Sequence, residues 1–242
     1  MKMDIQRSEE RGKADFGWLK ANYSFSFANY YNPHKIHFGV LRVLNDDTVD
    51  AAAGFPPHPH DNMEIITIPL SGSLEHKDSM GNTGVITRGE VQVMSAGSGI
   101  FHSEFNHSKS EKLSLFQIWI MTAKKNAEPR YDQRKFNTEE RKNKWQQVVN
   151  PMSENEGLQI HQDAWIFLGD FEKGKTTRHA IKKTGNGIYL LVIKGNITVN
   201  GQTLKTRDTA GITETSEIEI SMNEDSELML LDVPVGQLLV GG

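Results

Sequence analysis

The hydrophobic positions of the chain fall in short runs of β-branched and aromatic residues, with Gly, Asn, Asp or Pro between them about every eight to twelve residues. This spacing is typical of an all-β sandwich or barrel, because each run is long enough for one strand and each break for one turn. Signals for helices are few. In the first half, the expected strands cover residues 36–44, 63–70, 73–77, 84–87, 91–95 and 113–120.

The strand pattern stops in a polar stretch and then resumes. Residues 123–150 contain Pro129 and many charges, without a buried-face period, so we expect a connector with one short helix at most. Strands are expected again over residues 158–161, 165–168, 188–193, 197–199, 217–221 and 228–233. We therefore predict an N-terminal module over residues 1–130, a connector over 131–150 and a C-terminal module over 151–242.

Three polar segments are expected to form hairpin turns. Asn200-Gly201 lies between two short apolar runs, and both residue types reach positive φ cheaply, so a type I′ turn is predicted there. Asp46-Asp47 and Arg88-Gly89-Glu90 have the polar or glycine-containing composition of turns as well.

Composition and charge exclude several classes of protein. The 242 residues are 37% hydrophobic and 24% charged, which is typical of a globular protein that needs no disulfide to hold its core. A net charge of -4 without blocks of like charge argues against a nucleic-acid partner. The longest apolar runs fall short of the roughly 20 residues that cross a bilayer. Since no apolar segment follows the N-terminal charges, we expect no secretory signal and a cytoplasmic location.

Two short motifs in the first module bring histidine and carboxylate together. One contains His58-Pro59-His60 and the other His102-Ser103-Glu104. Residues i and i+2 of a strand share a face, so each pair offers two ligands to one point. Glu64 has the same parity as the first pair and is a fifth candidate.

The donor set indicates the kind of ion. Three imidazoles with one carboxylate suit Fe(II), Mn(II), Co(II), Ni(II), Cu(II) or Zn(II), and suit Ca(II) or Mg(II) poorly. If the coordination is octahedral, two positions remain for substrate or dioxygen. A lone histidine is more often a surface or hydrogen-bonded residue. Two His-x-(His/Glu) pairs at strand spacing, each beside a turn rich in Gly or Pro, nevertheless favour a metal site, and the absence of cysteine excludes zinc-thiolate chemistry.

These motifs resemble those of a known family. Residues 54–64 resemble the first cupin motif, and residues 89–102 resemble the second, with Ser95-Ala96-Gly97 where most cupins have Pro-x-Gly. The variants Gly-Phe-Pro-Pro-His-Pro-His and Met-Ser-Ala-Gly-Ser-Gly-Ile-Phe-His-Ser-Glu are similar to those of pirin and the bacterial pirin-like proteins. The resemblance covers nearly the whole chain and is strongest over residues 16–121.

The resemblance implies a bicupin, which is an all-β fold of two antiparallel β-barrel (jelly-roll) modules, with one divalent transition metal in the N-terminal module. Pirin-like proteins bind iron, which favours Fe(II) here. The positions that match their ligands are His58, His60, His102 and Glu104, and the match leaves out Glu64. Several family members are similar to quercetin 2,3-dioxygenases, which open the central ring of a flavonol with dioxygen and release carbon monoxide.

From this resemblance we predict a metal-dependent dioxygenase that acts on a small flavonol-like aromatic. The flavonol hydroxyl must lose its proton before dioxygen attacks, and a buried carboxylate is suited to take it. We therefore expect Glu104 to be both a metal ligand and the catalytic base.

Alternatives remain at the level of function. One is a non-catalytic iron-binding regulator that docks on a protein partner, and another is an isomerase or a sugar-binding cupin. In the second module, His161 and His179 stand alone, so that module is predicted to hold no metal and to stabilise the first. His76 and Asp78 lie in a Gly-flanked segment and are expected to stabilise a turn.

Overall fold

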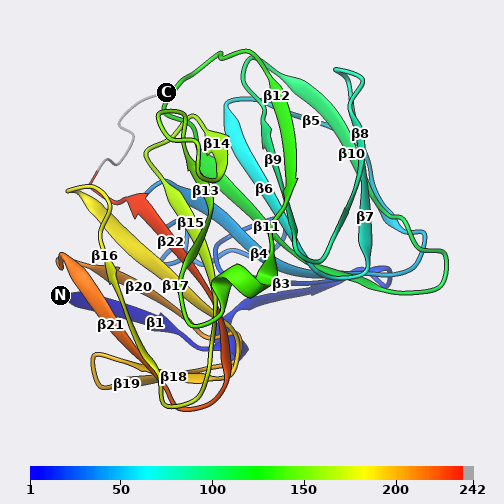
Figure 1. Ribbon diagram of the computed structural model, residues 1–242. Helices are drawn as coiled ribbons and strands as arrows, with labels where there is room; N and C mark the ends of the chain where they lie inside the picture. Colours follow the sequence, from blue (N-terminus) through cyan, green and yellow to red (C-terminus); the bar gives the residue numbers. More distant parts are fainter. Residues whose placement is uncertain (237–242) are drawn as a thin grey trace.

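The computed structural model describes residues 1–236 and is built almost entirely of strands, arranged in two modules (Figure 1). This confirms the predicted all-β fold of two jelly-roll modules. Each module is a sandwich of two sheets, one of seven strands and one of four, rather than a closed barrel. The last part of the predicted C-terminal module, residues 237–242, lies outside the described residues.

The larger sheet of the first module has the strand order β12-β9-β6-β11-β4-β3-β2. The bounds of these strands are β2 (Gly12–Asp15), β3 (Leu19–Tyr23), β4 (Leu41–Val49), β6 (Met63–Ser71), β9 (Glu90–Ser95), β11 (Leu113–Met121) and β12 (Arg130–Lys135). The smaller sheet has the order β5-β10-β7-β8, with β5 (Gly54–His60), β7 (Ser73–Asp78), β8 (Thr83–Thr87) and β10 (Ile100–Asn106).

The second module repeats this plan. Its larger sheet has the order β1-β20-β17-β22-β15-β13-β14, with β1 (Lys2–Gln6), β13 (Gln146–Pro151), β14 (Leu158–Ile160), β15 (Trp165–Phe171), β17 (Asn186–Lys194), β20 (Thr209–Thr213) and β22 (Ser226–Pro234). Its smaller sheet has the order β16-β21-β18-β19, with β16 (Thr176–Ala180), β18 (Asn196–Val199), β19 (Gln202–Lys205) and β21 (Glu217–Met222). Two short 3-10 turns complete the fold, η1 (Ser8–Glu10) and η2 (Thr138–Arg141).

The modules exchange material at their border. The first strand of the chain, β1, pairs with β20 in the sheet of the second module. The predicted connector is partly strand, since β12 pairs with β9 of the first module and β13 belongs to the second. The predicted borders of the connector, at residues 130 and 150, therefore remain a prediction. We propose that the second module also includes β1.

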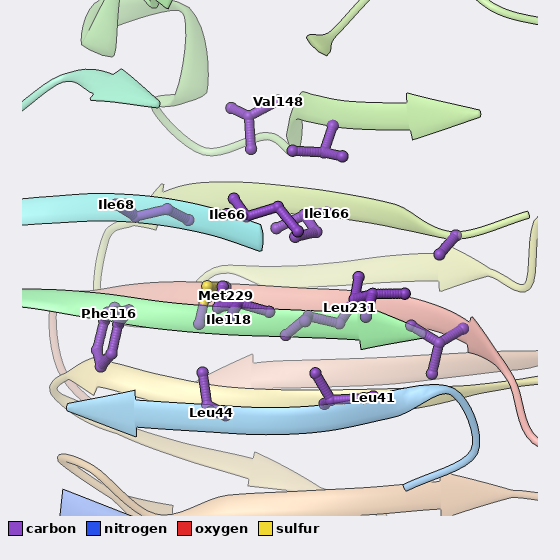
Figure 2. Close-up of a cluster of buried hydrophobic side chains, with 14 of the residues drawn as sticks. Leu41, Leu44, Ile66, Ile68, Phe116, Ile118, Val148, Ile166, Met229 and Leu231 are labelled. Atoms are coloured by element: carbon purple, nitrogen blue, oxygen red, sulfur yellow. The ribbon is translucent and has the colours of Figure 1, made fainter. Parts of the chain in front are cut away.

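The two seven-stranded sheets pack face to face and share one hydrophobic core. Figure 2 shows side chains of the first module, among them Ile66, Ile118 and Leu44, beside Ile166 and Met229 of the second. All five are buried completely. Burial of a side chain of this size contributes roughly 1.5–3 kcal/mol, so this shared core binds the modules into one unit.

The larger sheet of the first module is therefore buried on both faces. Ile118 faces the shared core, whereas its neighbours Gln117 and Trp119 face the four-stranded sheet and a pocket. Strand alternation gives β4 the same two faces. This double burial positions the functional site, because the inner face has room for polar groups that the core face excludes.

The structure revises two local predictions and confirms two. The strand expected over residues 36–44 begins at Leu41 and ends at Val49, so Asp46-Asp47 lies inside β4 instead of in a turn. The two polar residues had suggested a turn, but their side chains lie on opposite faces of a strand. Asn200-Gly201 forms the predicted hairpin, with φ of 46° and 73°, and Gly89 lies at φ 89° in the turn between β8 and β9. No helix in the described residues is long and apolar enough to span a membrane.

Candidate metal centre

Three of the predicted ligands lie together at one end of the four-stranded sheet. β10 runs antiparallel to β5, with His102 opposite His58 and Ile100 opposite His60. The ring centroids of His58 and His102 are 4.4 Å apart, and that of His60 is 4.9 Å from each. The candidate ligand nitrogens of the three rings lie within 4.8 Å of one another. The spacing argument from strand parity thus places all three side chains at one point.

A close approach of two backbones makes this arrangement possible. A Cβ on Gly54 would lie 2.2 Å from the carbonyl oxygen of Glu104, so only glycine allows β5 to pair with β10 here. The register between these strands then shifts between His102 and Glu104. The prolines that flank His58 lie on the exposed side of β5, at the rim of the sheet.

The protonation states of the rings suit metal binding. Burial, followed by the neighbouring His58, lowers the pKa of His60 to about 4 and contributes to lowering that of His102 to about 2. Both rings are therefore neutral at physiological pH, as a ligand must be. Nδ1 of His58 lies 2.8 Å from the carbonyl oxygen of Pro56, so it carries the proton and leaves Nε2 free.

His102 gives the clearest indication that the cluster fits an ion. Its side chain is buried, and neither ring nitrogen has a hydrogen-bond partner among residues 1–236. An unpaired polar atom in a protein interior costs about 1–3 kcal/mol unless a ligand or water satisfies it. Three neutral imidazoles around one point form a donor set for a divalent transition metal, and a bound ion would satisfy the ring.

Glu104, also on β10, lies beside the three histidines, but among the described residues it groups with His102 and His76 and not with His58 and His60. Its carboxylate oxygen lies within 4.8 Å of the ligand nitrogens of His102 and His76. The amide of Gln117 donates to Oε2 at 2.9 Å, and the hydroxyl of Thr67 contacts Oε1 at 3.4 Å. Burial raises the pKa of Glu104 to about 7, although both hydrogen bonds lower it. A carboxyl that titrates near neutrality is suited to take and return a proton.

His76 is a residue of the site that the sequence did not reveal. It is completely buried, and its ring stacks on Tyr131 with the centroids 4.6 Å apart. Its Nε2 faces Asp78 at 3.3 Å and its Nδ1 faces the amide of Gln92 at 3.5 Å. Because both nitrogens have partners, His76 supports the His102 ring from behind. Asp78 in turn accepts from the backbone of Met80 and stabilises the following turn, as expected.

Glu64 lies apart from the centre. Its carboxylate accepts a hydrogen bond of 2.6 Å from Ser95, and it belongs to neither group of candidate ligands within the described range. Glu64 pairs with Ile120, whose side chain packs in the shared core, while the adjacent Ile65 faces the site. Glu64 was predicted to share the strand face of His60, but the turn at Asn62, where φ is 47°, interrupts the strand between them.

A pocket of about 370 Å³ opens beside the histidines. This volume is within the range of small-molecule sites, roughly 300–1,000 Å³. Its walls are mainly apolar and are formed by Leu19, Phe27, Phe55, Leu74, Leu115 and Trp119. The Trp119 ring meets the His60 ring edge to face, with the centroids 4.8 Å apart. A flat apolar ligand would therefore lie between aromatic side chains and reach the metal centre at one end.

A row of polar residues crosses the inner face of the seven-stranded sheet, and three of its members, Tyr23, Asn45 and Gln117, line the pocket. Cross-strand pairing aligns Tyr23 with Asn45, Asn45 with Gln117, Gln117 with Thr67 and Thr67 with Gln92. We call these five residues the polar row. The signal in the sequence is a single polar residue inside an otherwise apolar run, as at Gln117 in β11 and Thr67 in β6.

Two family models match the chain and together cover most of it. The model described as Pirin matches residues 4–120, and the model described as Quercetinase C-terminal cupin domain matches residues 147–233. The first match contains all four predicted metal ligands.

Characterised relatives and solved structures agree with this. The chain is 43% identical to a quercetin 2,3-dioxygenase of Escherichia coli K12, across 95% of this chain and 98% of the relative. It is 42% identical to a pirin-like protein of Caulobacter vibrioides, across 95% of this chain and 99% of that protein. A crystal structure of the E. coli bacterial pirin YhhW in complex with nickel(II) superimposes with a TM-score of 0.91, at 41% identity over 96% of this chain and 99% of that one. By fold and sequence, the chain belongs to the pirin family, within the cupin dioxygenases.

Proposed function

We propose that this protein is a metal-dependent dioxygenase of the quercetin 2,3-dioxygenase type, which opens the central ring of a flavonol-like substrate with dioxygen and releases carbon monoxide. One observation carries the proposal. Three clustered histidines and, beside them, a carboxyl with a pKa near 7 lie at one end of an apolar pocket of about 370 Å³ with aromatic walls. A relative that carries this name matches 95% of the chain.

In this proposal His58, His60, His102 and Glu104 hold one divalent transition metal, with Fe(II) as the physiological ion. The nickel complex of a relative supports a divalent ion at such a centre. When bound, the metal supplies a Lewis acid that stabilises the negative charge of a deprotonated substrate oxygen.

The side chains of the pocket perform the remaining tasks. Glu104 takes the proton of the substrate hydroxyl, and Gln117 and Thr67 hold its carboxylate in position. Phe27, Phe55 and Trp119 orient the flat substrate and exclude water from it. Exclusion of water also keeps the pKa of Glu104 raised, since its largest cause is burial.

Dioxygen uptake with quercetin tests the proposal. The protein is reconstituted anaerobically with Fe(II), and uptake and metal content are measured for the wild type and for His58→Ala. We expect the variant to lose both metal and uptake. His107→Ala is a matched control, because His107 is exposed and pairs with Glu75 on the surface. Full iron occupancy in the wild type without uptake would refute the proposed activity.

A second candidate function is supported by the outer face of the four-stranded sheet. Phe101 and Phe105 on β10 and Val85 on β8 are exposed there by 57%, 37% and 38%. Phe105 and Val85 both pair with Glu75 of the strand between them, so they belong to one row. Exposed aromatic residues of this kind are typical of a docking face, and they favour the iron-binding regulator if no uptake is found.

A further inference from the structure

The pocket has a second polar point besides the metal centre. Asn45 and Asp47 line it from β4, with their side chains on the same face of that strand. Asn45 lies opposite Gln117, and Asp47 lies opposite Leu115, two pairs further along. Asp47 is therefore the diagonal neighbour of Gln117, roughly 7–8 Å from it, whereas Gln117 itself contacts Glu104.

Both side chains have an acceptor atom without a partner. Asn45 is 3% and Asp47 is 5% exposed, and in the described part of the chain neither Oδ1 accepts a hydrogen bond. Leaving a buried acceptor unsatisfied costs about 1–3 kcal/mol. Since both residues line the pocket, a donor group of the ligand is placed to satisfy them.

The neighbouring Asp46 does have partners, so the unpaired acceptor atoms are confined to one face of β4. Asp46 points to the opposite face, where its carboxylate pairs with Arg11 at 3.5 Å and with Arg207 at 3.1 Å. Within residues 1–236, no such ion pair is formed by Asp47. The pocket wall that Asp47 belongs to also includes the apolar side chains of Leu19 and Leu115.

The chemistry of Asp47 suits recognition of a hydroxyl group. Burial, then the neighbouring Asp46 and Glu104, raises its pKa to about 8. A neutral carboxyl offers one donor and one acceptor, and Asn45 adds an amide beside it. A phenolic hydroxyl also donates and accepts, so it complements this pair in a way that an unsubstituted ring edge does not.

We propose that Asn45 and Asp47 are specificity-determining residues that bind a hydroxyl group at the end of the substrate remote from the metal ligands. The inference rests on the proposed function for the class of substrate, an enolisable aromatic. It adds that the enzyme prefers substrates hydroxylated on the distal ring. The apolar walls bind any flat ring system, and these two residues select among them.

The test compares quercetin with galangin, which is the same flavonol without hydroxyl groups on its phenyl ring. Dissociation constants are measured by anaerobic absorbance titration of the metal-loaded protein, so that no turnover occurs. We expect the wild type to bind quercetin at least about tenfold more tightly than galangin. Asp47→Leu is expected to reduce this preference at least about tenfold, with galangin binding unchanged.

Two further variants separate recognition from a general disturbance. Asp47→Asn keeps a donor and an acceptor in the same shape and is expected to retain most of the preference. Asp15→Asn removes an exposed carboxylate far along the chain and is expected to leave the preference as it is. Metal content is measured for each variant. If Asp47→Leu does not fold, Asn45→Ala is titrated in its place, with a partial loss of preference expected.

The outcomes distinguish this inference from the proposed function. A wild type that binds both flavonols equally, or a folded Asp47→Leu with an unchanged preference, would overturn the inference even if dioxygen uptake is normal. A preference that depends on Asp47 in a protein that takes up no dioxygen would support the inference and refute the proposed activity.

Discussion

The amide Nε2 of Gln117 donates a hydrogen bond of 2.9 Å to Oε2 of Glu104, and so connects the seven-stranded sheet to the proposed metal ligand on the four-stranded sheet. Gln117 lies in the middle of the polar row, between Asn45 and Thr67. The carboxylate is thus held in position by Gln117, which within residues 1–236 forms no hydrogen bond with His58, His60 or His102.

Removal of this donor should weaken metal binding. We expect Gln117→Leu to reduce the affinity for the divalent ion about 10–100-fold, because a ligand carboxylate that loses its supporting hydrogen bond is less well oriented. Competition with a chelator of known affinity measures the change. Ser114→Ala, on the same strand, is the control. An unchanged affinity in Gln117→Leu would show that the hydrogen bond is not needed to position Glu104.

Replacement of the proposed base should abolish turnover. Glu104→Gln keeps the shape of the side chain but takes up no proton, so we expect kcat with quercetin to fall at least about 100-fold. Dioxygen uptake and metal content are measured together. Ser103→Ala, the neighbour on the opposite face of β10, should behave as the wild type. Full turnover by a metal-loaded Glu104→Gln would exclude the role of this residue as base.

In the metal-free protein, Asp47 should make a contribution to stability that is lost as the pH rises. Its pKa is about 8 in the folded protein and near 3.8 when exposed, so folding favours the neutral carboxyl. This contribution is fully present below about pH 4 and is lost as the pH rises through 8. Relative to the wild type, the free energy of unfolding of Asp47→Asn should therefore increase with pH. At pH 9 it should be higher than that of the wild type by at least about 1 kcal/mol.

Urea unfolding of both metal-free proteins between pH 4 and 9 provides the measurement. Asp15→Asn, which changes an exposed side chain, is the control and should follow the wild-type curve. Parallel curves for Asp47→Asn and the wild type would show that Asp47 does not titrate differently in the two states.

The ion pairs of Asp46 should stabilise the junction of the modules. Arg207 of the second module pairs with Asp46 and also covers the ring of Phe116, with its guanidinium carbon 5.0 Å from the ring centroid. Asp46→Ala leaves the buried Arg11 without its partner, and we expect the free energy of unfolding to fall by about 3 kcal/mol. The free energy of unfolding of both proteins is measured by chemical denaturation.

An exposed ion pair offers the matched comparison. Arg178 and Glu219 form a bond of 2.7 Å with more than half of each side chain accessible, and Glu219→Gln should have no measurable effect. Equal losses for the two variants would mean that the pairs at the junction contribute no more than pairs at the surface.

The sequence predicts the metal centre better than the pocket, and the reason is local geometry. His58, His60 and His102 follow from spacing, because alternation within one strand is fixed by the backbone. The end of that parity at Asn62, which removes Glu64 from the centre, depends on a turn that the spacing does not reveal.

The polar residues of the pocket depend on long-range packing. Asp46-Asp47 has the composition of a turn, yet β4 is buried on both faces and each carboxylate meets a different environment. Likewise His76 appears in the sequence as a loop histidine, and only the pairing of β7 with β10 brings it behind His102. Such contacts join segments far apart in the chain, and local composition contains no record of them.

The pairing of β1 with β20 also has a consequence for synthesis on the ribosome. Lys2 lies opposite Thr213, so β1 must wait until β20 has been synthesised before its partner exists. At about 5–20 residues per second, that delay is roughly 10–40 s. The first module has all its own strands by residue 135 and is free to fold during this time, whereas the second sheet is completed only when it captures β1.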